Sequence, residues 1–189
     1  MTVLGFTITF HGPFRVGAAY ARDGVDAAID HDDPLPADHL KGVMRFAAVA
    51  LLGARHRALD EIFGSVRVPS PWSWSSATIS SGNPEDWNIG SRHRVTIDPR
   101  THSAVKDRLV LAEQAAPRTT AWFEVTQVGR LAPDDEAEHR LILRCAAAGV
   151  HGLGAWRRRG LGWVGITAHD GPITSGEVER LLALKGQRQ

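Results

Sequence analysis

The chain has 189 residues, of which 43% are hydrophobic, so it can build the core of one domain and bulk disorder is excluded. Its formal net charge is only +1, so any nucleic-acid site must come from local clusters of basic side chains. Cys145 is the single cysteine, which excludes an intramolecular disulfide and cysteine-rich zinc sites and is typical of the cytoplasm. No apolar run approaches the roughly 20 residues of a membrane span, and the first residues do not fit a signal peptide, so we expect no membrane contact.

The first part of the chain is predicted to hold one strand and two helices, separated by a long acidic loop. Residues 17–36 form this loop, and a loop of about 20 residues in a compact domain is usually functional or mobile. The first helix is expected at 38–53 with Asp38 as its N-cap, because apolar residues recur there at helical spacing. A shorter helix is expected at 55–63. The strand is predicted from the alternating residues Leu4, Phe6, Ile8 and Phe10.

The middle of the chain is predicted to be rich in strands. Trp72 and Trp74 indicate a strand inside a stretch rich in Pro, Ser and Gly. Residues 94–98 and 104–113 are typical of two strands joined by a turn, which predicts a β-hairpin. A further strand is predicted at 119–128.

The last part is predicted to contain two helices around a glycine-rich loop and one strand. Pro133 opens a helix that runs to about 148, and residues 162–168 form the last strand. Thr174 and Glu177 form a capping box before a C-terminal helix.

The order of the core elements predicts the fold class. Without the loops and the hairpin, the order is strand, helix, strand, strand, helix, strand, which is that of a ferredoxin-like α+β sandwich. We expect a single domain over residues 1–189. The hairpin is an insertion at about 83–118, and the C-terminal helix spans about 175–186.

Residues 149–165 combine six glycines with three successive arginines, which favours a segment that binds a polyanion. Exposed glycine amides can cradle an anion, and arginine pairs with phosphate. Trp156 could stack on a base, although tryptophan more often packs in a core. A flexible surface loop with incidental charge is the alternative. The residues predicted to bind RNA here are Gly152, Gly154, Arg157, Arg158, Arg159, Gly160 and Gly162.

Two cations near the start of the first helix form a second candidate site. Lys41 and Arg45 are one turn apart and share a face, and Gly42 would let a backbone approach closely. Together with the free amides of a helix start, they could hold a phosphate. The alternative is solvated charge, with Arg45 paired to an acidic neighbour.

The acidic loop is a candidate for metal-assisted chemistry. Mg²⁺ is held by one or two carboxylates together with water and substrate phosphates, so an aspartate here could support phosphodiester cleavage. The alternative is a solvated loop. His11, His31 and His39 lie near the proposed site, and a histidine could act as a general base without a metal. The aspartates of the loop are Asp23, Asp26, Asp30, Asp32 and Asp33.

Several segments occur in the same order as in the RAMP superfamily of CRISPR-associated proteins, and the chain most closely resembles the backbone subunit of type III effector complexes. In chain order, the segments resemble the end of the family's first strand, the start of the family's first helix, the family's Leu-Phe-Gly and Ser-Asp-Ala segments, its β-hairpin thumb and its glycine-rich loop. The matching segments are residues 14–17 (FRVG), 35–45 (LPADHLKGVMR), 62–65 (IFGS), 74–77 (WSSA), 95–113 and 152–162.

The resemblance implies a modified ferredoxin-like (RRM-like) fold with an inserted β-hairpin thumb and a glycine-rich loop. It implies cytoplasmic copies that stack along a guide RNA (crRNA), next to other effector-complex subunits. Lys41, Gly42, Arg45 and the glycine-rich loop would contact the guide. The thumb would enter between the guide and a complementary target RNA.

The resemblance also implies that a loop aspartate supports target RNA cleavage that depends on Mg²⁺ or Mn²⁺. Asp26, in Gly24-Val25-Asp26, matches that position best and is the candidate catalytic and metal-binding residue. The family's proline after the aspartate is absent here, so Asp23 or Asp30 could take the role. A non-catalytic structural or cap subunit and a metal-independent guide-processing endoribonuclease are the alternatives.

Overall fold

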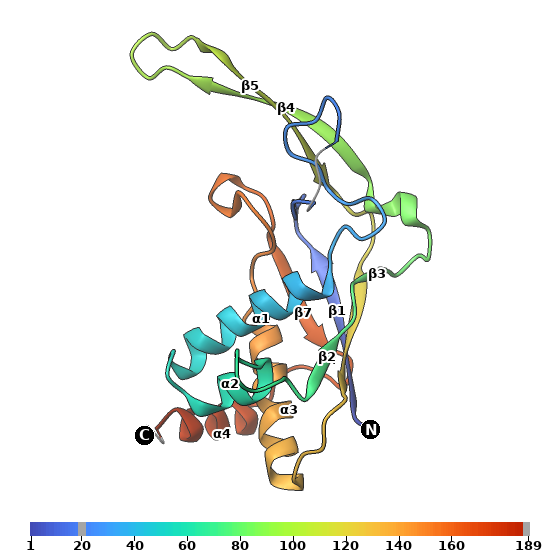
Figure 1. Ribbon diagram of the computed structural model, residues 1–189, viewed down its shortest axis with the longest axis vertical. Helices are drawn as coiled ribbons and strands as arrows, with labels where there is room; N and C mark the ends of the chain where they lie inside the picture. Colours follow the sequence, from blue (N-terminus) through green and yellow to red (C-terminus); the bar gives the residue numbers. More distant parts are fainter. Residues whose placement is uncertain (19–21, 187–189) are drawn as a thin grey trace.

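The structure is a computed structural model that describes residues 1–18 and 22–186 (Figure 1). The part of the acidic loop at 19–21 lies outside the described residues. The elements, in chain order, are β1 (Val3–Phe10), α1 (Ala37–Leu52), α2 (Arg57–Phe63), β2 (Trp72–Trp74), β3 (Thr78–Ile79), the 3-10 turn η1 (Pro84–Trp87), β4 (Ile89–Ile97), β5 (Ala104–Ala115), β6 (Ala121–Gln127), α3 (Pro133–Ala148), the 3-10 turn η2 (Arg157–Arg159), β7 (Val164–Ala168) and α4 (Ser175–Gly186).

The body of the protein is an antiparallel sheet with helices on one side (Figure 1). The strand order is β2-β6-β1-β7, and the short β3 also pairs with β6. Phe6 on β1 lies between Phe123 and Ala168 in the register, and the rings of Phe6 and Phe123 stack 5.1 Å apart. The predicted alternation in β1 is confirmed, because Leu4, Phe6 and Ile8 are buried while the residues between them are partly exposed.

Helix α1 begins without a side-chain cap, so the prediction of Asp38 as N-cap is wrong. The N-cap is Pro36, whose side chain has no polar atom, and Asp38 lies inside the first turn. The N–H group of Ala37 instead donates to Oγ of Ser76, 3.2 Å away, from the segment after β2. A tertiary contact therefore satisfies a group that a local cap normally satisfies.

The two later helices begin as the sequence predicts. Pro133 is at the first position of α3. In the capping box of α4, the N–H of Thr174 donates to Glu177 Oε2 over 2.9 Å, and the N–H of Glu177 donates to Thr174 Oγ1 over 3.3 Å. The partly buried Glu177 also accepts from the buried Arg144 of α3, which ties α4 to the body.

Strands β4 and β5 form a hairpin that projects from the body, at the place where the sequence predicts one (Figure 1). The strands are longer than predicted, because their base is part of the body. Ala115 is fully buried and exchanges two backbone hydrogen bonds, of 2.8 and 2.9 Å, with Phe14. Further out, one hairpin face carries apolar side chains that are about half exposed, namely Val95, Ile97 and Leu109.

None of the described helices is both long enough and apolar enough to cross a membrane.

Candidate nucleic-acid interface

The glycine-rich segment is fixed against the end of β1, which does not fit a flexible surface loop. Gly154 and Gly162 both have positive φ, and a side chain at either would strike a backbone carbonyl. The close approach allows the N–H of Gly162 to donate to Pro13 over 2.7 Å, and that of Ala155 to donate to Arg15 over 2.8 Å. The glycines therefore allow two backbones to pack directly together.

These bonds leave fewer amides for an anion than the sequence suggests. The N–H of Gly154 donates to Nε2 of His39 on α1, 2.9 Å away, and the N–H of Gly162 is used by Pro13. Burial, followed by the charge of Arg157, lowers the pKa of His39, so its neutral ring remains a hydrogen-bond acceptor. A role in RNA binding for Gly152, Gly154, Gly160 and Gly162 stays a prediction.

The three arginines of the segment form the exposed 3-10 turn η2. Trp156 before the turn and Gly160 after it have left-handed backbones, which isolate the turn as a protrusion. Arg157, Arg158 and Arg159 are all exposed. Within residues 1–18 and 22–186, none of them forms an ion pair with a carboxylate. Their charge is therefore available to an external anion.

An open groove of about 690 Å³ lies between α1 and this segment. Phe46 on α1 and Trp163 after the turn line it and are 69% and 64% exposed, and Arg157 and Arg158 line it as well. The sequence analysis did not select the two aromatic residues. The signal was present for Phe46, because it falls outside the apolar stripe of its helix and so has no place in the core.

Lys41 and Arg45 share a face of α1, as predicted, but this face does not meet the glycine-rich segment. A helix turns by about 100° per residue, which places both cations roughly opposite His39 and Phe46. Nζ of Lys41 lies 5.2 Å from the ring centroid of Trp74, and Arg45 pairs with Asp60 of α2 at 3.1 Å. The acidic neighbour expected as an alternative for Arg45 is therefore present. Gly42 is exposed, with open space around it.

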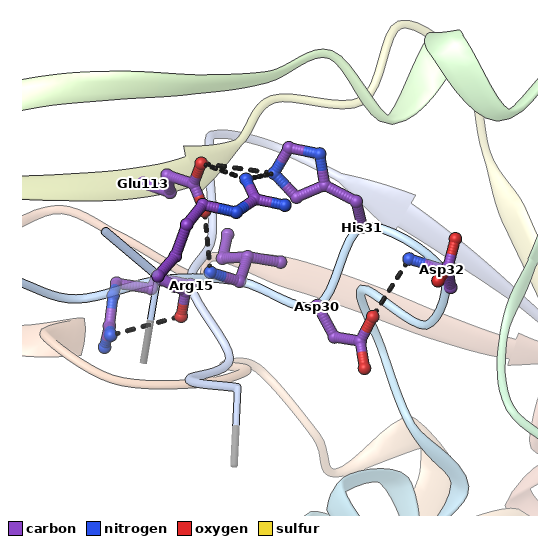
Figure 2. A network of polar contacts seen from close by, with 8 residues as sticks. Arg15, Asp30, His31, Asp32 and Glu113 are labelled. Atoms are coloured by element: carbon purple, nitrogen blue, oxygen red, sulfur yellow. Dashed lines mark hydrogen bonds and ion pairs between the residues drawn. The ribbon is translucent and has the colours of Figure 1, made fainter. Parts of the chain in front are cut away.

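Glu113 of β5 holds the acidic loop against the base of the hairpin (Figure 2). Its side chain accepts from the N–H of Ile29 over 2.9 Å and from Arg22 over 2.8 Å, and it lies 3.1 Å from Nε2 of His31. Burial alone would raise the pKa of Glu113, but the hydrogen bonds from Ile29 and His31 and the charge of Arg22 lower it. The sequence analysis missed Glu113, whose only local signal is a charge at an inward-facing strand position.

Asp26, the candidate catalytic residue, lies along the same strand. Its N–H donates to the carbonyl of Leu111 over 3.0 Å, and its Oδ2 accepts from the N–H of Leu111 over 2.8 Å. The side chain is exposed. Asp30 accepts instead from the N–H group of Asp32 (Figure 2) and from the N–H group of Asp33. The two aspartates therefore have different surroundings, although the sequence allows either to act.

The described residues do not by themselves build a metal site. In residues 1–18 and 22–186, no group of three or more His, Cys, Asp or Glu side chains could hold an ion. One oxygen of Asp26 is already engaged by Leu111. A Mg²⁺ or Mn²⁺ ion at Asp26 would therefore need further oxygen ligands from water and bound phosphate, because the described residues supply no preformed site.

Comparison with known proteins finds a family and solved structures that match most of the chain. The family model described as the RAMP superfamily matches residues 7–165. A similar solved structure is a chain of the type III-B Cmr-β complex bound to cognate target RNA, determined by cryo-EM. It has a TM-score of 0.62 and 18% identity, over 88% of this chain and 60% of that chain.

A second similar structure is a chain of type III-B Cmr-β in its apo state. It has a TM-score of 0.67 and 11% identity, over 88% of this chain and 97% of that chain. At these identities the likeness shows a shared fold: a mixed α/β arrangement with antiparallel sheets. This chain spans 60% of the length of the first structure and nearly all of the second. Among the curated proteins compared, none matches.

Proposed function

The chain belongs to the RAMP superfamily, and we propose that it is a guide-RNA-binding backbone subunit of a type III-like CRISPR effector complex. The observation that carries the proposal is the protruding turn Arg157–Arg159, whose exposed arginines have no carboxylate partner among the described residues. The proposal is supported by the shared fold with Cmr-β chains, one of which is described as bound to cognate target RNA.

The arrangement of the sheet supports the finer fold assignment. The antiparallel order β2-β6-β1-β7 fits a ferredoxin-like core in which β4 and β5 are inserted before β6. We assign this hairpin as the thumb that would meet a guide and its complementary target RNA. Copies of the chain would stack head to tail along the guide, next to other subunits of the complex.

The guide would follow the basic turn and the groove beside it. The arginines would hold phosphates, and the exposed rings of Phe46 and Trp163 offer surfaces on which bases can stack. Lys41 and Arg45 would form a separate contact on the other side of α1, because the exposed pair of Arg45 with Asp60 is weak and easily exchanged for a phosphate.

The test is co-purification and RNA binding by a charge-matched pair of variants. In the first, Arg157, Arg158 and Arg159 become Gln, and in the control, three exposed arginines elsewhere become Gln. We expect wild type and control to bind single-stranded RNA in low salt, and the first variant to lose most of its affinity. Equal binding by both variants would contradict the proposal. The control arginines are Arg55, Arg67 and Arg180.

Cleavage of bound target RNA through Asp26 is a second proposal, supported by the exposed carboxylate that β5 holds in place. Asp26→Asn removes the charge and keeps an oxygen that can accept from Leu111, and Asp32→Asn, at an exposed aspartate of the same loop, is the matched control. Cleavage with Mg²⁺ or Mn²⁺ that is lost with chelator and in Asp26→Asn alone would support it. Cleavage that resists chelator would favour a guide-processing enzyme, and binding without cleavage would leave a structural or cap subunit.

A further inference from the structure

Two arginines from distant segments converge on the ring of Trp156. The guanidinium carbon of Arg94, on β4, lies 4.3 Å from the ring centroid, and that of Arg15, after β1, lies 4.9 Å from it. A guanidinium over an indole ring is attracted by the ring's electrons. Trp156 therefore joins the hairpin, the end of β1 and the glycine-rich segment, and its ring is already occupied by cations, so it is not a free platform for a base.

Within residues 1–18 and 22–186, neither Arg15 nor Arg94 forms an ion pair with a carboxylate. Glu113 is the acidic group that acts on Arg15, but its side chain is committed to Ile29, Arg22 and His31. In Figure 2 the Glu113 carboxylate faces His31, and Arg15 lies on another side of the cluster. Burial, followed by the charge of Arg94, lowers the pKa of Arg15. Desolvating an arginine beside a second one is unfavourable unless an anion joins them.

Arg15 also has an unused donor. Its Nε is buried and has no hydrogen-bond partner within the described part of the chain, and a terminal nitrogen makes only a long 3.5 Å contact with the carbonyl of Ala28. Buried polar groups are usually paired, so such an atom calls for an explanation. A guanidinium has five donors arranged to hold two oxygens of one phosphate or carboxylate.

The backbone holds this arrangement at a cost. Trp156 has φ of 57°, a left-handed backbone that is rare and unfavourable for a bulky residue. The position is imposed by the preceding residues: Ala155 donates to the Arg15 carbonyl, and Gly154 packs on the same group. Backbone strain of this kind persists where surrounding contacts fix the residue, and it is common at ligand-binding sites.

We propose that Arg15, Arg94 and Trp156 form a binding position for one phosphate group of RNA where β4 passes the glycine-rich segment. Trp156 orients the two guanidiniums, and the phosphate supplies the missing negative charge. The ligand class is a phosphodiester, because the same segment continues directly into the exposed arginines of η2, which suit a polymer of phosphates. The assignment of that polymer as RNA rests on the proposed function.

The test measures how RNA affinity depends on salt. For single-stranded nucleic acid, the slope of log K against log salt falls by about 0.7 for each phosphate that is no longer neutralised. Arg15→Gln, Arg94→Gln, the double variant and wild type are compared by fluorescence anisotropy with labelled single-stranded RNA. Arg92→Gln is the control, because Arg92 is exposed on the same face of β4 and does not contact Trp156.

Shared binding of one phosphate predicts that the double variant loses about 0.7 of slope in total, whereas two separate contacts predict about 1.4. Arg15→Lys keeps the charge and loses the fork of donors, so it should keep the slope and still bind more weakly. The proposal is overturned if the double variant loses about 1.4, or if no variant differs from Arg92→Gln.

Inorganic phosphate separates this inference from the proposed function. The fluorescence of Trp156 is the difference in emission between wild type and Trp156→Phe. This fluorescence should change when inorganic phosphate is added, and the change should be absent in Arg15→Gln and Arg94→Gln. Wild type that binds no RNA in low salt refutes the proposed function, while a phosphate response in the same protein supports the site. No response to phosphate together with no response to RNA overturns the site as well.

Discussion

Replacing Glu113 by Gln tests whether this residue holds the acidic loop on the hairpin. The change keeps the size of the side chain and removes its charge. The bond from Ile29 is buried, and hydrogen bonds to charged groups contribute about 1.5–3 kcal/mol. The side chains of Arg22 and His31 are 38% and 42% exposed, so solvent screens these contacts and we assign each about 0.5 kcal/mol.

An amide oxygen can still accept from one donor, so we expect Glu113→Gln to lower the free energy of unfolding by about 2 kcal/mol. Urea denaturation measures this change, and amide exchange at Ile29 should become faster than in wild type. Glu124→Gln is the control, because Glu124 is an exposed glutamate on β6, and it should change stability by less than about 0.5 kcal/mol.

The same variant has a predicted pH dependence. Because the folded protein lowers the pKa of Glu113, its contribution is fully present above the unfolded pKa of about 4.3 and is lost as pH falls through the folded value. The stability difference between wild type and Glu113→Gln should thus be constant near neutral pH and shrink in acid. A change no larger than that of the control, or a difference that grows in acid, would refute the reasoning.

Three further predictions concern single residues. Gly162→Ala should lower the melting temperature by several degrees, because it combines a positive φ with a clash against the Leu153 carbonyl; an unchanged melting curve would contradict this. Asp38→Ala should alter the free energy of unfolding by less than about 0.5 kcal/mol, since Asp38 is not the cap of α1 and loss of a true cap costs about 1 kcal/mol; a loss of that size in urea denaturation would restore it as a cap. Burial and Arg157 lower the pKa of His39 in the folded protein, so acidification below the unfolded pKa of about 6.5 should lower stability, because the unfolded chain binds the proton more readily, and should speed exchange of the Gly154 amide. His39→Gln keeps an acceptor without titrating, so NMR of this variant should show no such pH dependence.

The features that the sequence predicts well are those encoded locally. The alternation in β1 and the capping box of Thr174 and Glu177 involve residues within a few positions of one another. The position of Asp38 was misread because a hydroxyl from a remote segment, Ser76, competes for the same helix end. Local chemistry indicates that a helix starts there but not which group satisfies its amides.

The candidate site depends on contacts between distant residues, which explains what was missed. Glu113 and Ile29 are 84 positions apart, so no local pattern links them. The spacing of Lys41 and Arg45 shows that the two side chains share a face of α1. Which face of α1 meets the glycine-rich segment depends on how the helix packs, and the sequence does not show this. The arginines of η2 could be selected as candidates from the sequence, because three successive charges are evident in any conformation.

The hairpin is stiff at one end and compliant at the other. Its base is clamped by Phe14 and by the loop held through Glu113, while further out, among the described residues, strands β4 and β5 pair only with each other (Figure 1). A two-stranded ribbon alone is marginally stable in water. The tip can therefore bend to fit what it meets, while the clamped residues at the base keep their place on the body.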